Sequence, residues 1–275
     1  MPELAEVETV KRYLEKHITN YMITSYEQFQ NKLRYQLDEP STVSSNIVNS
    51  KITSIRRRAK YLLIDLSNSQ TIVFHLGMTG RLVVKNNMQI KEKHDHIKIN
   101  LSNNKSLNLN NYRRFGMFYN YPTNILSKQN FIKNLGLEPL DNEFNSNYLQ
   151  NKLANRNVAI KNALMNNNIL VGVGNIYAAE SLFKAKINPQ TIASMLTYQQ
   201  TTSLVKAIKD TLLEAIAAGG TTLKDFVSGD SKPGYFKQKL AVYGRDNLSC
   251  KLCGKKIIKI KQAGRSTFFC KYCQK

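Results

Sequence analysis

Four cysteines near the C-terminus place the strongest constraint on how this chain folds. Cys250 and Cys253 form one C-x2-C pair, and Cys270 and Cys273 form a second pair after sixteen intervening residues. Each pair can lie at a turn with both sulfurs facing inward, so the two pairs predict a closed tetrahedral thiolate site. Such a site favours one structural Zn²⁺ ion and leaves no open position for catalysis.

The segment between the two cysteine pairs predicts a β-hairpin. Residues 257–261 and 266–269 alternate enough for two strands, and Gly264 and Arg265 are expected in the connecting loop. A ribbon that serves folding alone would show the same cysteine spacing. The basic residues of this module nevertheless favour contact with nucleic acid as well. They are Lys255, Lys256, Lys259, Lys261 and Arg265.

The charge balance of the 275-residue chain indicates a polyanionic partner. Forty Lys and Arg against nineteen Asp and Glu give a net charge of +21, and phosphate backbones are the commonest polyanion. Charge alone does not separate DNA from RNA or from an anionic membrane, and a generally lysine-rich proteome would also produce it. No apolar run approaches the roughly 18 residues of a membrane helix, and no signal peptide is visible. We therefore expect a cytoplasmic protein without a membrane partner, in which the cysteines bind metal.

The hydrophobic patterning predicts an α+β multidomain protein. Residues 3–16 are typical of an amphipathic helix, and short β-branched segments at 52–55, 61–66, 71–75, 81–85 and 97–101 indicate a β-sandwich. A connection is expected at 124–140, followed by helices at 148–153, 158–165, 175–184 and 197–218 and a Gly-rich region at 219–236. We predict an N-terminal β-sandwich with flanking helices (1–135), a helical domain (136–240) and a zinc hairpin (241–275).

The first six residues suggest a reactive amine. A small residue at position 2 favours removal of Met1, which would leave Pro2 as a secondary amine at a helix start. An α-amino group titrates near pH 7.7–8.0, and the helix dipole should lower that pKa further. Glu3 and Glu6 follow on one helix face. A helix start with stabilising acidic residues explains the same residues without any chemistry.

Motifs along the whole chain resemble those of bacterial formamidopyrimidine-DNA glycosylase, a family that removes oxidised purines from DNA. The resemblance runs from the N-terminal Met-Pro-Glu-Leu-x-Glu-Val-Glu-Thr-Val to the C-terminal Cys-Gln-Lys. Between them, in the family order, lie 57–62, 75–80, 93–96, 113–116, 135–140, 171–178, 219–223, 232–236 and 242–245. The segment 171–178 is similar to the family's helix–two-turn–helix motif, in which backbone N–H groups at a helix start bind phosphate.

The resemblance implies roles for five catalytic residues. Pro2 would attack the sugar C1′ and expel the damaged base, while Glu3 would protonate the ring oxygen and Glu6 would support the site. Lys60 would hold a phosphate and donate a proton for β-elimination, and Arg265 would serve δ-elimination. The implied enzyme is a bifunctional glycosylase and abasic-site lyase that needs no nucleotide cofactor and acts as a monomer on damaged double-stranded DNA.

The resemblance also implies a set of DNA contacts. An enzyme that flips a nucleotide out of the helix must fill the gap that it leaves, and inserted side chains commonly kink the duplex. Met78 and Phe115 would be the apolar fillers, and Arg113 would face the orphaned partner base. Further DNA contacts are implied at His94, Arg156 and Asn175. The segment 227–235 is similar to the family's mobile loop over the flipped base.

Two alternatives to this interpretation remain open from the sequence. An endonuclease VIII-like enzyme for oxidised pyrimidines would share the superfamily, and a non-catalytic zinc protein that binds DNA or RNA would share the charge and the cysteines. The chain also departs from the family pattern in a few places. These are Ala5 for proline, Asn111-Tyr112 for Asp-Pro, Ala179, and Lys271 for proline. The Asn111-Tyr112 change bears on the preference for the base opposite the lesion.

Overall fold

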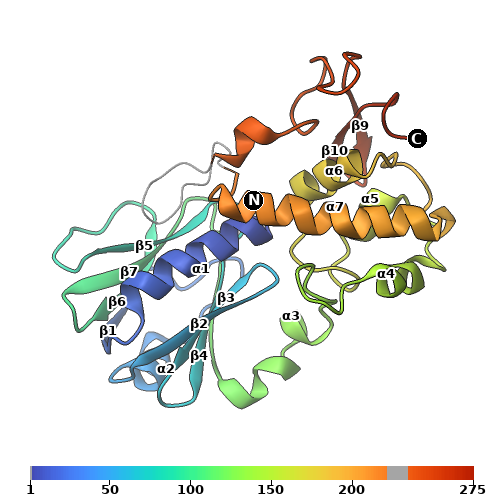
Figure 1. The fold of residues 1–275 in the computed structure, drawn as a ribbon. Coiled ribbons are helices and arrows are strands. Elements are labelled where there is room, and N and C mark those ends of the chain that lie inside the picture. The colour runs from blue at the N-terminus through green and yellow to red at the C-terminus, as the bar shows by residue number, and fades with distance from the viewer. Residues whose placement is uncertain (1, 222–234) are drawn as a thin grey trace. The chain divides into compact units, whose positions relative to one another are not determined.

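The structure, a computed structural model, describes residues 2–221 and 235–275, which form two compact units (Figure 1). The first unit combines Met1–Lys133 with Gly219–Tyr235, and the second combines Asn134–Ala218 with Phe236–Lys275. The second unit thus contains both the helical segment and the cysteine tail. None of the helices within the described ranges has the length and hydropathy that a membrane span requires.

The first unit is a β-sandwich of two four-stranded antiparallel sheets, ordered β1-β6-β7-β5 and β2-β3-β4-β8. Apolar side chains from both sheets, such as Ile64, Phe74, Ile99 and Leu109, form one buried core. The predicted fold class is therefore confirmed. The strands are β1 (Ile23–Gln28), β2 (Ile52–Arg58), β3 (Tyr61–Leu66), β4 (Gln70–His75), β5 (Gly80–Asn86), β6 (Asp95–Leu101), β7 (Lys105–Asn111) and β8 (Met117–Pro122).

Helix α1 (Leu4–Ile18) packs along this sandwich and contacts β2, β3 and β5 (Figure 1). Its buried stripe includes Val7, Val10 and Leu14, which recur at helical spacing. The short helix α2 (Pro40–Ile47), which begins at a proline, contacts β1. The patterning had placed the first helix correctly within two residues of each end, but it did not reveal α2.

Strands β1, β7 and β8 were absent from the predicted strands. Strand β7 carries three asparagines, and Asn108 is buried in it. Asparagine is depleted in strands, so the local pattern gave no strand signal, although pairing with β5 and β6 holds this segment in the sheet. The predicted connection at 124–140 is also more regular than expected. It begins with η1 (Thr123–Lys128) and α3 (Asn130–Lys133), which belong to the first unit.

The second unit contains four longer helical elements followed by the hairpin. They are α4 (Ser146–Leu153), α5 (Ile160–Leu164), α6 (Asn175–Lys184) and α7 (Tyr198–Ala217), with the short turns η2 (Ala193–Met195) and η3 (Phe236–Lys239). Helix α7 begins with a capping box in which Thr197 and Gln200 bond to each other's backbone N–H groups. Helix α7 packs against both α4 and α6.

The zinc hairpin is formed by β9 (Ile258–Gln262) and β10 (Arg265–Phe269). Its loop has only two residues, Ala263 and Gly264, both at positive φ, as a tight hairpin turn requires. Arg265 was expected in this loop, but it is the first residue of β10 and pairs with Gln262. The hairpin shares a buried cluster with α6, since Phe268 and Ile257 pack with Phe183.

Candidate functional site

The start of α1 holds the three N-terminal candidates in one turn. Pro2, Glu3 and Glu6 are all buried, and the two carboxylate side chains are only 3 % and 2 % exposed. The backbone N–H of Glu3 donates to Glu6 Oε2 at 2.8 Å. Two buried carboxylates beside a helix N-terminus lie where the helix dipole favours negative charge. The chain therefore keeps both acids next to Pro2.

Glu6 also joins α1 to a segment far along the chain. Its Oε1 accepts a 2.7 Å hydrogen bond from the backbone N–H of Thr221. Gly220 has φ +81°, and a Cβ there would lie 3.1 Å from Glu6 Oε1. Both Glu6 oxygens thus hold backbone N–H groups, which suits a supporting role. The predicted mobile loop at 227–235 falls almost entirely on residues 222–234, outside the described residues.

Lys60 lies at the two-residue turn between β2 and β3. Ala59 precedes it with φ +54°, a strained conformation for a residue with a Cβ. His75 at the end of β4 faces the same neighbourhood, where burial first, and then the charges of Lys60 and Arg34, lower the pKa of His75 to about 4. His75 Nδ1 accepts from the Gly77 N–H at 3.1 Å, so the neutral ring carries its proton on Nε2. His75 lies within the 75–80 motif, and the sequence predicts no role for it.

The segments 75–80 and 113–116, which carry the residues predicted to fill the gap left by a flipped nucleotide, lie against each other. Gly77 has φ +64°, and a Cβ there would be 2.4 Å from the backbone of Phe115. Thr79 ties the segments together, because its hydroxyl donates to Asn111 Oδ1 and accepts from the Arg113 N–H, both at 3.1 Å. The structure therefore brings the segments of Met78, Arg113 and Phe115 together, with Arg113 and Phe115 exposed and Met78 half-buried. The Arg113 guanidinium lies 4.9 Å from the centre of the Phe115 ring.

His94 packs against Tyr112, one of the residues that depart from the family pattern. The His94 and Tyr112 rings meet edge to face at 5.1 Å, and Tyr112 is 68 % exposed. Asn111, in contrast, is fully buried, and its carbonyl bonds to His96 Nε2 at 2.9 Å. Asn111 anchors the loop, whereas Tyr112 projects from it.

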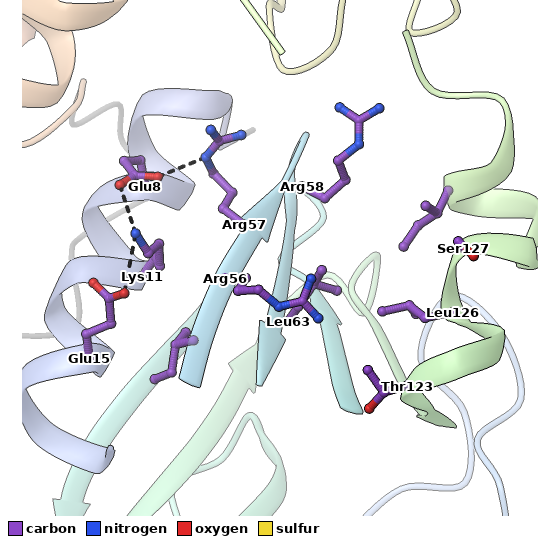
Figure 2. Close-up of a pocket in the computed structure, with 12 residues that line it drawn as sticks. Glu8, Lys11, Glu15, Arg56, Arg57, Arg58, Leu63, Thr123, Leu126 and Ser127 are labelled. Carbon is purple, nitrogen blue, oxygen red and sulfur yellow. Dashed lines mark hydrogen bonds and ion pairs between the residues drawn. The ribbon is translucent and has the colours of Figure 1, made fainter. Parts of the chain in front are cut away.

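A cavity of about 720 Å³ opens between α1, β2 and η1 (Figure 2). Glu8 lies in its wall on α1, and its carboxylate is 3.0 Å from Arg57 and 3.4 Å from Lys11. Burial alone would raise the pKa of Glu8, but the hydrogen bond from Arg57 and the charge of Lys11 lower it below its ordinary value. Arg56 is paired bidentately with Asp65. Neither Glu8 nor Asp65 was predicted as a site residue from the sequence.

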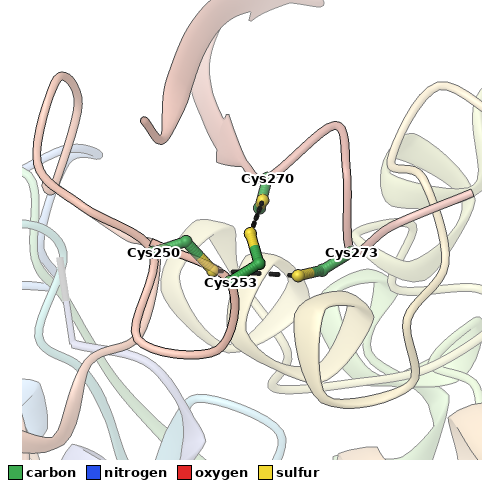
Figure 3. A group of neighbouring side chains, drawn as sticks. All are labelled: Cys250, Cys253, Cys270 and Cys273. Carbon is green, nitrogen blue, oxygen red and sulfur yellow. Dashed lines mark hydrogen bonds between the residues drawn. The ribbon is translucent and has the colours of Figure 1, made fainter. Parts of the chain in front are cut away.

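The four cysteines converge at the base of the hairpin (Figure 3). Their sulfurs lie within 4.8 Å of one another, with Cys253 and Cys270 at 3.5 Å and Cys250 and Cys273 at 3.9 Å. A Zn–S bond of about 2.3 Å implies S···S edges of about 3.8 Å in a tetrahedron. Burial opposes ionisation of Cys250, but backbone N–H groups of Cys253 and Leu252 outweigh it and lower its pKa to about 7. These cysteines form a structural zinc site, as predicted.

A buried lysine that the sequence analysis missed links the helices of the second unit to the hairpin. Lys161 of α5 is 1 % exposed, and its Nζ bonds to Asn175 Oδ1 at 2.5 Å and to Thr267 Oγ1 at 2.7 Å. Asn175 Nδ2 in turn donates to the Ser266 carbonyl at 3.0 Å. The Asn175 amide thus orders β10, which begins at Arg265, and keeps one N–H for another acceptor.

Glu180 is a second residue that sequence reasoning overlooked. Its carboxylate, on α6, accepts three backbone hydrogen bonds of 2.8–3.0 Å from Ala241, Val242 and Tyr243. The segment that leads into the cysteines is thereby fixed to α6. Arg156 lies on the surface of the same unit, where its carbonyl accepts from the Ser194 N–H at 3.2 Å. Only a buried contact between distant segments reveals Glu180, so a local motif gave no signal for it.

The predicted site residues are divided between the two units. Pro2, Glu3, Glu6, Lys60, Met78, His94, Arg113 and Phe115 belong to the first unit, and Arg156, Asn175, Arg265 and the four cysteines belong to the second. Each set is ordered by its own buried polar network. The first set centres on a helix start and an exposed loop cluster, and the second on a helix start and a metal hairpin.

Three family models match successive parts of the chain. The formamidopyrimidine-DNA glycosylase N-terminal domain matches residues 1–118, the formamidopyrimidine-DNA glycosylase H2TH domain matches 135–227, and a zinc finger found in FPG and IleRS matches 249–275. A formamidopyrimidine-DNA glycosylase of Rickettsia bellii is 51 % identical over 276 residues and covers all of both chains.

Two solved structures show the same likeness in three dimensions. One is a Lactococcus lactis FPG mutant in complex with DNA that contains Fapy-dG; it is 32 % identical, has a TM-score of 0.91 and covers 99 % of each chain. The other is a MutM protein in complex with DNA that contains carbocyclic 8-oxo-G, with the same identity, TM-score and coverage.

Proposed function

Because this chain belongs to the formamidopyrimidine-DNA glycosylase family, we propose that it excises formamidopyrimidines and 8-oxoguanine from duplex DNA. In this proposal it also cleaves the strand at the resulting abasic site, as a bifunctional glycosylase and lyase in base excision repair. The observation that carries the proposal is the start of α1, where Pro2 lies beside the buried carboxylates of Glu3 and Glu6. A protein that only binds nucleic acid needs no such arrangement.

The proposed reaction begins at the Pro2 nitrogen once Met1 has been removed. The nitrogen lone pair attacks C1′ of the damaged nucleotide, and the C1′–N bond breaks with its electrons leaving on the base. Glu3 protonates the ring oxygen, the ring opens, and loss of the amine proton leaves an iminium ion between Pro2 and C1′. Glu6 keeps the helix start in place through the Glu3 and Thr221 N–H groups.

Strand cleavage follows from the same iminium ion. Because the iminium acidifies C2′, loss of a C2′ proton expels the 3′ phosphate in β-elimination, and a second proton loss expels the 5′ phosphate in δ-elimination. In the first step we assign to Lys60 the proton that the departing 3′ phosphate takes up, and in the second step we assign to Arg265 the contact with the departing 5′ phosphate. The short turn that presents Lys60 and the hairpin strand that begins at Arg265 support these roles, because each projects a cation from a rigid element.

The DNA contacts in this proposal follow the exposed loops and the start of α6. Met78 and Phe115 fill the gap left by the flipped nucleotide, and Arg113 faces the partner base. The Asn175 amide and the backbone at the start of α6 bind phosphate. The remaining two contacts are His94 and Arg156.

We also propose the setting in which the enzyme works. It acts as a monomer on damaged double-stranded DNA in the bacterial cytoplasm, held at the nucleoid by DNA binding, without a membrane or a nucleotide cofactor. The net charge of +21 supports a polyanionic partner. The folding domains are 1–135, 136–240 and 241–275 in this proposal, with the third depending on zinc.

Borohydride trapping tests the nucleophile directly. Borohydride reduces the iminium ion to a stable amine, so wild-type protein should become covalently fixed to a duplex containing 8-oxoguanine. Pro2→Gly should abolish base release while lesion binding persists, and Pro40→Gly at the start of α2 is the matched control. Mass spectrometry of the trapped protein should show that Met1 is absent. Trapping through any residue other than the N-terminal one would contradict the proposed role of Pro2.

The substrate class needs a separate comparison. Matched duplexes with a single 8-oxoguanine, formamidopyrimidine or thymine glycol should be incubated with excess enzyme, and single-turnover rates of base release should be measured. The proposal expects the two purine lesions to be released faster than the pyrimidine lesion. Release of thymine glycol alone would indicate the endonuclease VIII-like specificity instead.

A further inference from the structure

A pocket in the first unit is lined by three arginines and a phenylalanine and has no acidic residue in its wall. Its volume is about 440 Å³, and its lining comprises Leu33, Arg34, Arg113, Arg114 and Phe115. We propose that this pocket binds a phosphate group of the undamaged DNA strand, next to the base that faces the lesion, through Arg34 and Arg114, with Arg113 in the same wall.

The fold holds these three arginines close together although their charges repel. The Arg34 N–H donates to the Gly116 carbonyl at 3.2 Å, which fixes the 33–34 segment to the loop 112–116. The Arg114 N–H donates to the Asn111 carbonyl at 3.1 Å, and φ at Arg114 is +56°. A bulky residue at positive φ is strained, and such strain persists where the surrounding structure imposes it. The arginines therefore converge because of backbone contacts.

No anion of the protein compensates this charge within the described residues. Over residues 2–221 and 235–275, the guanidinium groups of Arg34, Arg113 and Arg114 have no ion pair. Two of them instead lie over aromatic rings, Arg34 over Tyr35 at 5.6 Å and Arg113 over Phe115 at 4.9 Å. Guanidinium groups present several donors that match phosphate oxygens, so a phosphate would satisfy groups that the chain leaves available.

The position of the pocket indicates which strand supplies the phosphate. This step rests on the proposed function, in which Arg113 faces the partner base and Phe115 enters the helix. Arg113 and Phe115 form part of the pocket wall, so the pocket opens beside the strand that carries the partner base. Arg34 and Arg114 would then hold that strand while the lesion strand is distorted.

The inference is tested with the double variant Arg34→Gln/Arg114→Gln. Affinity should be measured on a duplex with a tetrahydrofuran abasic analogue, which no lyase can cleave, over a series of salt concentrations. We expect binding to weaken about tenfold and the slope of log K against log salt to fall by about 0.9, the value for one lost phosphate contact. The matched control is Arg56→Gln, which removes one exposed positive charge that Asp65 neutralises and should leave the slope unchanged.

Methylphosphonate substitution locates the phosphate. One uncharged methylphosphonate is placed in turn at each phosphate flanking the partner base, and at the matching positions of the lesion strand. Wild-type protein should lose affinity at one position of the undamaged strand, and the double variant should be insensitive at that same position. Equal sensitivity in both proteins, or an unchanged salt slope in the double variant, would overturn the inference. Matched melting temperatures establish that each variant is folded.

The outcome separates this inference from the proposed function. If wild-type protein is trapped on 8-oxoguanine DNA and the double variant binds with wild-type affinity, only the phosphate pocket is wrong. If wild-type protein is neither trapped nor selective for damaged DNA, the proposed function itself fails. Inorganic phosphate added at constant ionic strength should weaken the wild-type complex more than that of the double variant, and an equal effect on both would count against the pocket.

Discussion

The Glu8 cavity and the Arg34 pocket lie in the same unit and are both lined by arginines, yet their charges are arranged in opposite ways. In the Glu8 cavity, Arg57 and Lys11 pair with Glu8 (Figure 2). Arg56, also in the cavity wall, pairs with Asp65. In the Arg34 pocket, all three arginines lack an acidic partner within residues 2–221 and 235–275. A count of Lys and Arg does not distinguish the cations of the two regions, but only the Arg34 pocket leaves its cations available to an external anion.

This difference separates cations that hold the fold from cations that bind a ligand. Removing a partner from a paired, partly buried charge leaves the other charge without compensation, which lowers the stability of the protein. Removing an unpaired exposed charge changes stability little, but it changes the affinity for a polyanion and the salt dependence of that affinity. The free energy of unfolding and the salt dependence of DNA affinity should therefore respond to different substitutions. Experiments on both regions can test this difference.

The largest change in the free energy of unfolding is expected for substitution of Glu8. Glu8→Gln should lower the free energy of unfolding by about 3 kcal/mol, because Arg57 and Lys11 lose a common counter-charge in a partly buried site. Urea unfolding measures the loss, and the salt slope of lesion binding should be unchanged. Glu15→Gln, which removes a more exposed partner of Lys11, is the control and should cost less than about 1 kcal/mol. Equal losses of unfolding free energy in Glu8→Gln and Glu15→Gln would show that the pairs at Glu8 do not stabilise the fold more than an exposed pair does.

A somewhat smaller effect is expected for the buried cation of the second unit. Lys161→Met should lower the free energy of unfolding by about 2–3 kcal/mol, because Asn175 Oδ1 and Thr267 Oγ1 lose their buried partner. The same variant should weaken lesion binding, since β10 and the Asn175 amide lose a common anchor. Restored binding in Lys161→Arg, which keeps the donors, would support the anchoring role. Unchanged unfolding in Lys161→Met would contradict it.

The free energy of unfolding should depend on pH because the folded protein keeps His75 neutral. Its pKa falls to about 4 in the folded protein, against about 6.5 in the unfolded chain, because burial and the charges of Lys60 and Arg34 disfavour the protonated ring. The unfolded chain then binds the proton more readily, so this contribution is complete above pH 6.5 and is lost as pH falls towards 4. The loss should reach about 2 kcal/mol at pH 5.

Unfolding of wild type and His75→Gln between pH 7 and pH 5 measures this loss by difference. His75→Gln should show about 2 kcal/mol less acid destabilisation than wild type. Arg34→Gln should reduce the His75 effect, since it removes one of the charges that lower the pKa. An identical pH profile in wild type and His75→Gln would show that the ring is not held neutral.

Features set by neighbouring residues were predictable from the sequence. The spacing of the cysteines predicted the zinc site, and the helical patterning predicted α6 at Asn175–Lys184. The hairpin was also placed, but Arg265 was assigned to the loop because alternation does not locate a two-residue turn. The family motifs supplied residue types for the site, although not their surroundings.

Features set by contacts between distant segments were not predictable. Glu180 binds backbone groups 61 to 63 residues away, and Lys161 reaches Thr267 across 106 residues. Arg34 joins Arg113 and Arg114 in one pocket, and a backbone hydrogen bond from the Arg34 N–H to the Gly116 carbonyl holds these distant segments together. In a one-dimensional pattern each of these is an isolated charged residue, which is usually solvated surface. Their roles depend on burial and partners that appear only in the fold.

The smallest effect is expected at Tyr112, which stands where the family has proline. Tyr112→Pro should change the free energy of unfolding by less than about 1 kcal/mol, because the ring is 68 % exposed and packs only edge to face on His94. Lesion binding should weaken about threefold, the loss of one aromatic contact beside Arg113. Tyr112→Phe, which keeps the ring, should bind like wild type.

A second measurement on Tyr112→Pro is the ratio of its affinities for a lesion opposite cytosine and for a lesion opposite adenine. Arg113 is held by the Thr79 hydroxyl, which is itself fixed to buried Asn111, and Tyr112 takes no part in those bonds. The ratio should therefore stay the same in Tyr112→Pro although both affinities fall. A changed ratio would mean that the anchor at Asn111 does not by itself position Arg113. The departure from the family pattern would then act on the partner base through the backbone, and the unpaired arginines would be less rigidly placed than the paired ones at Glu8.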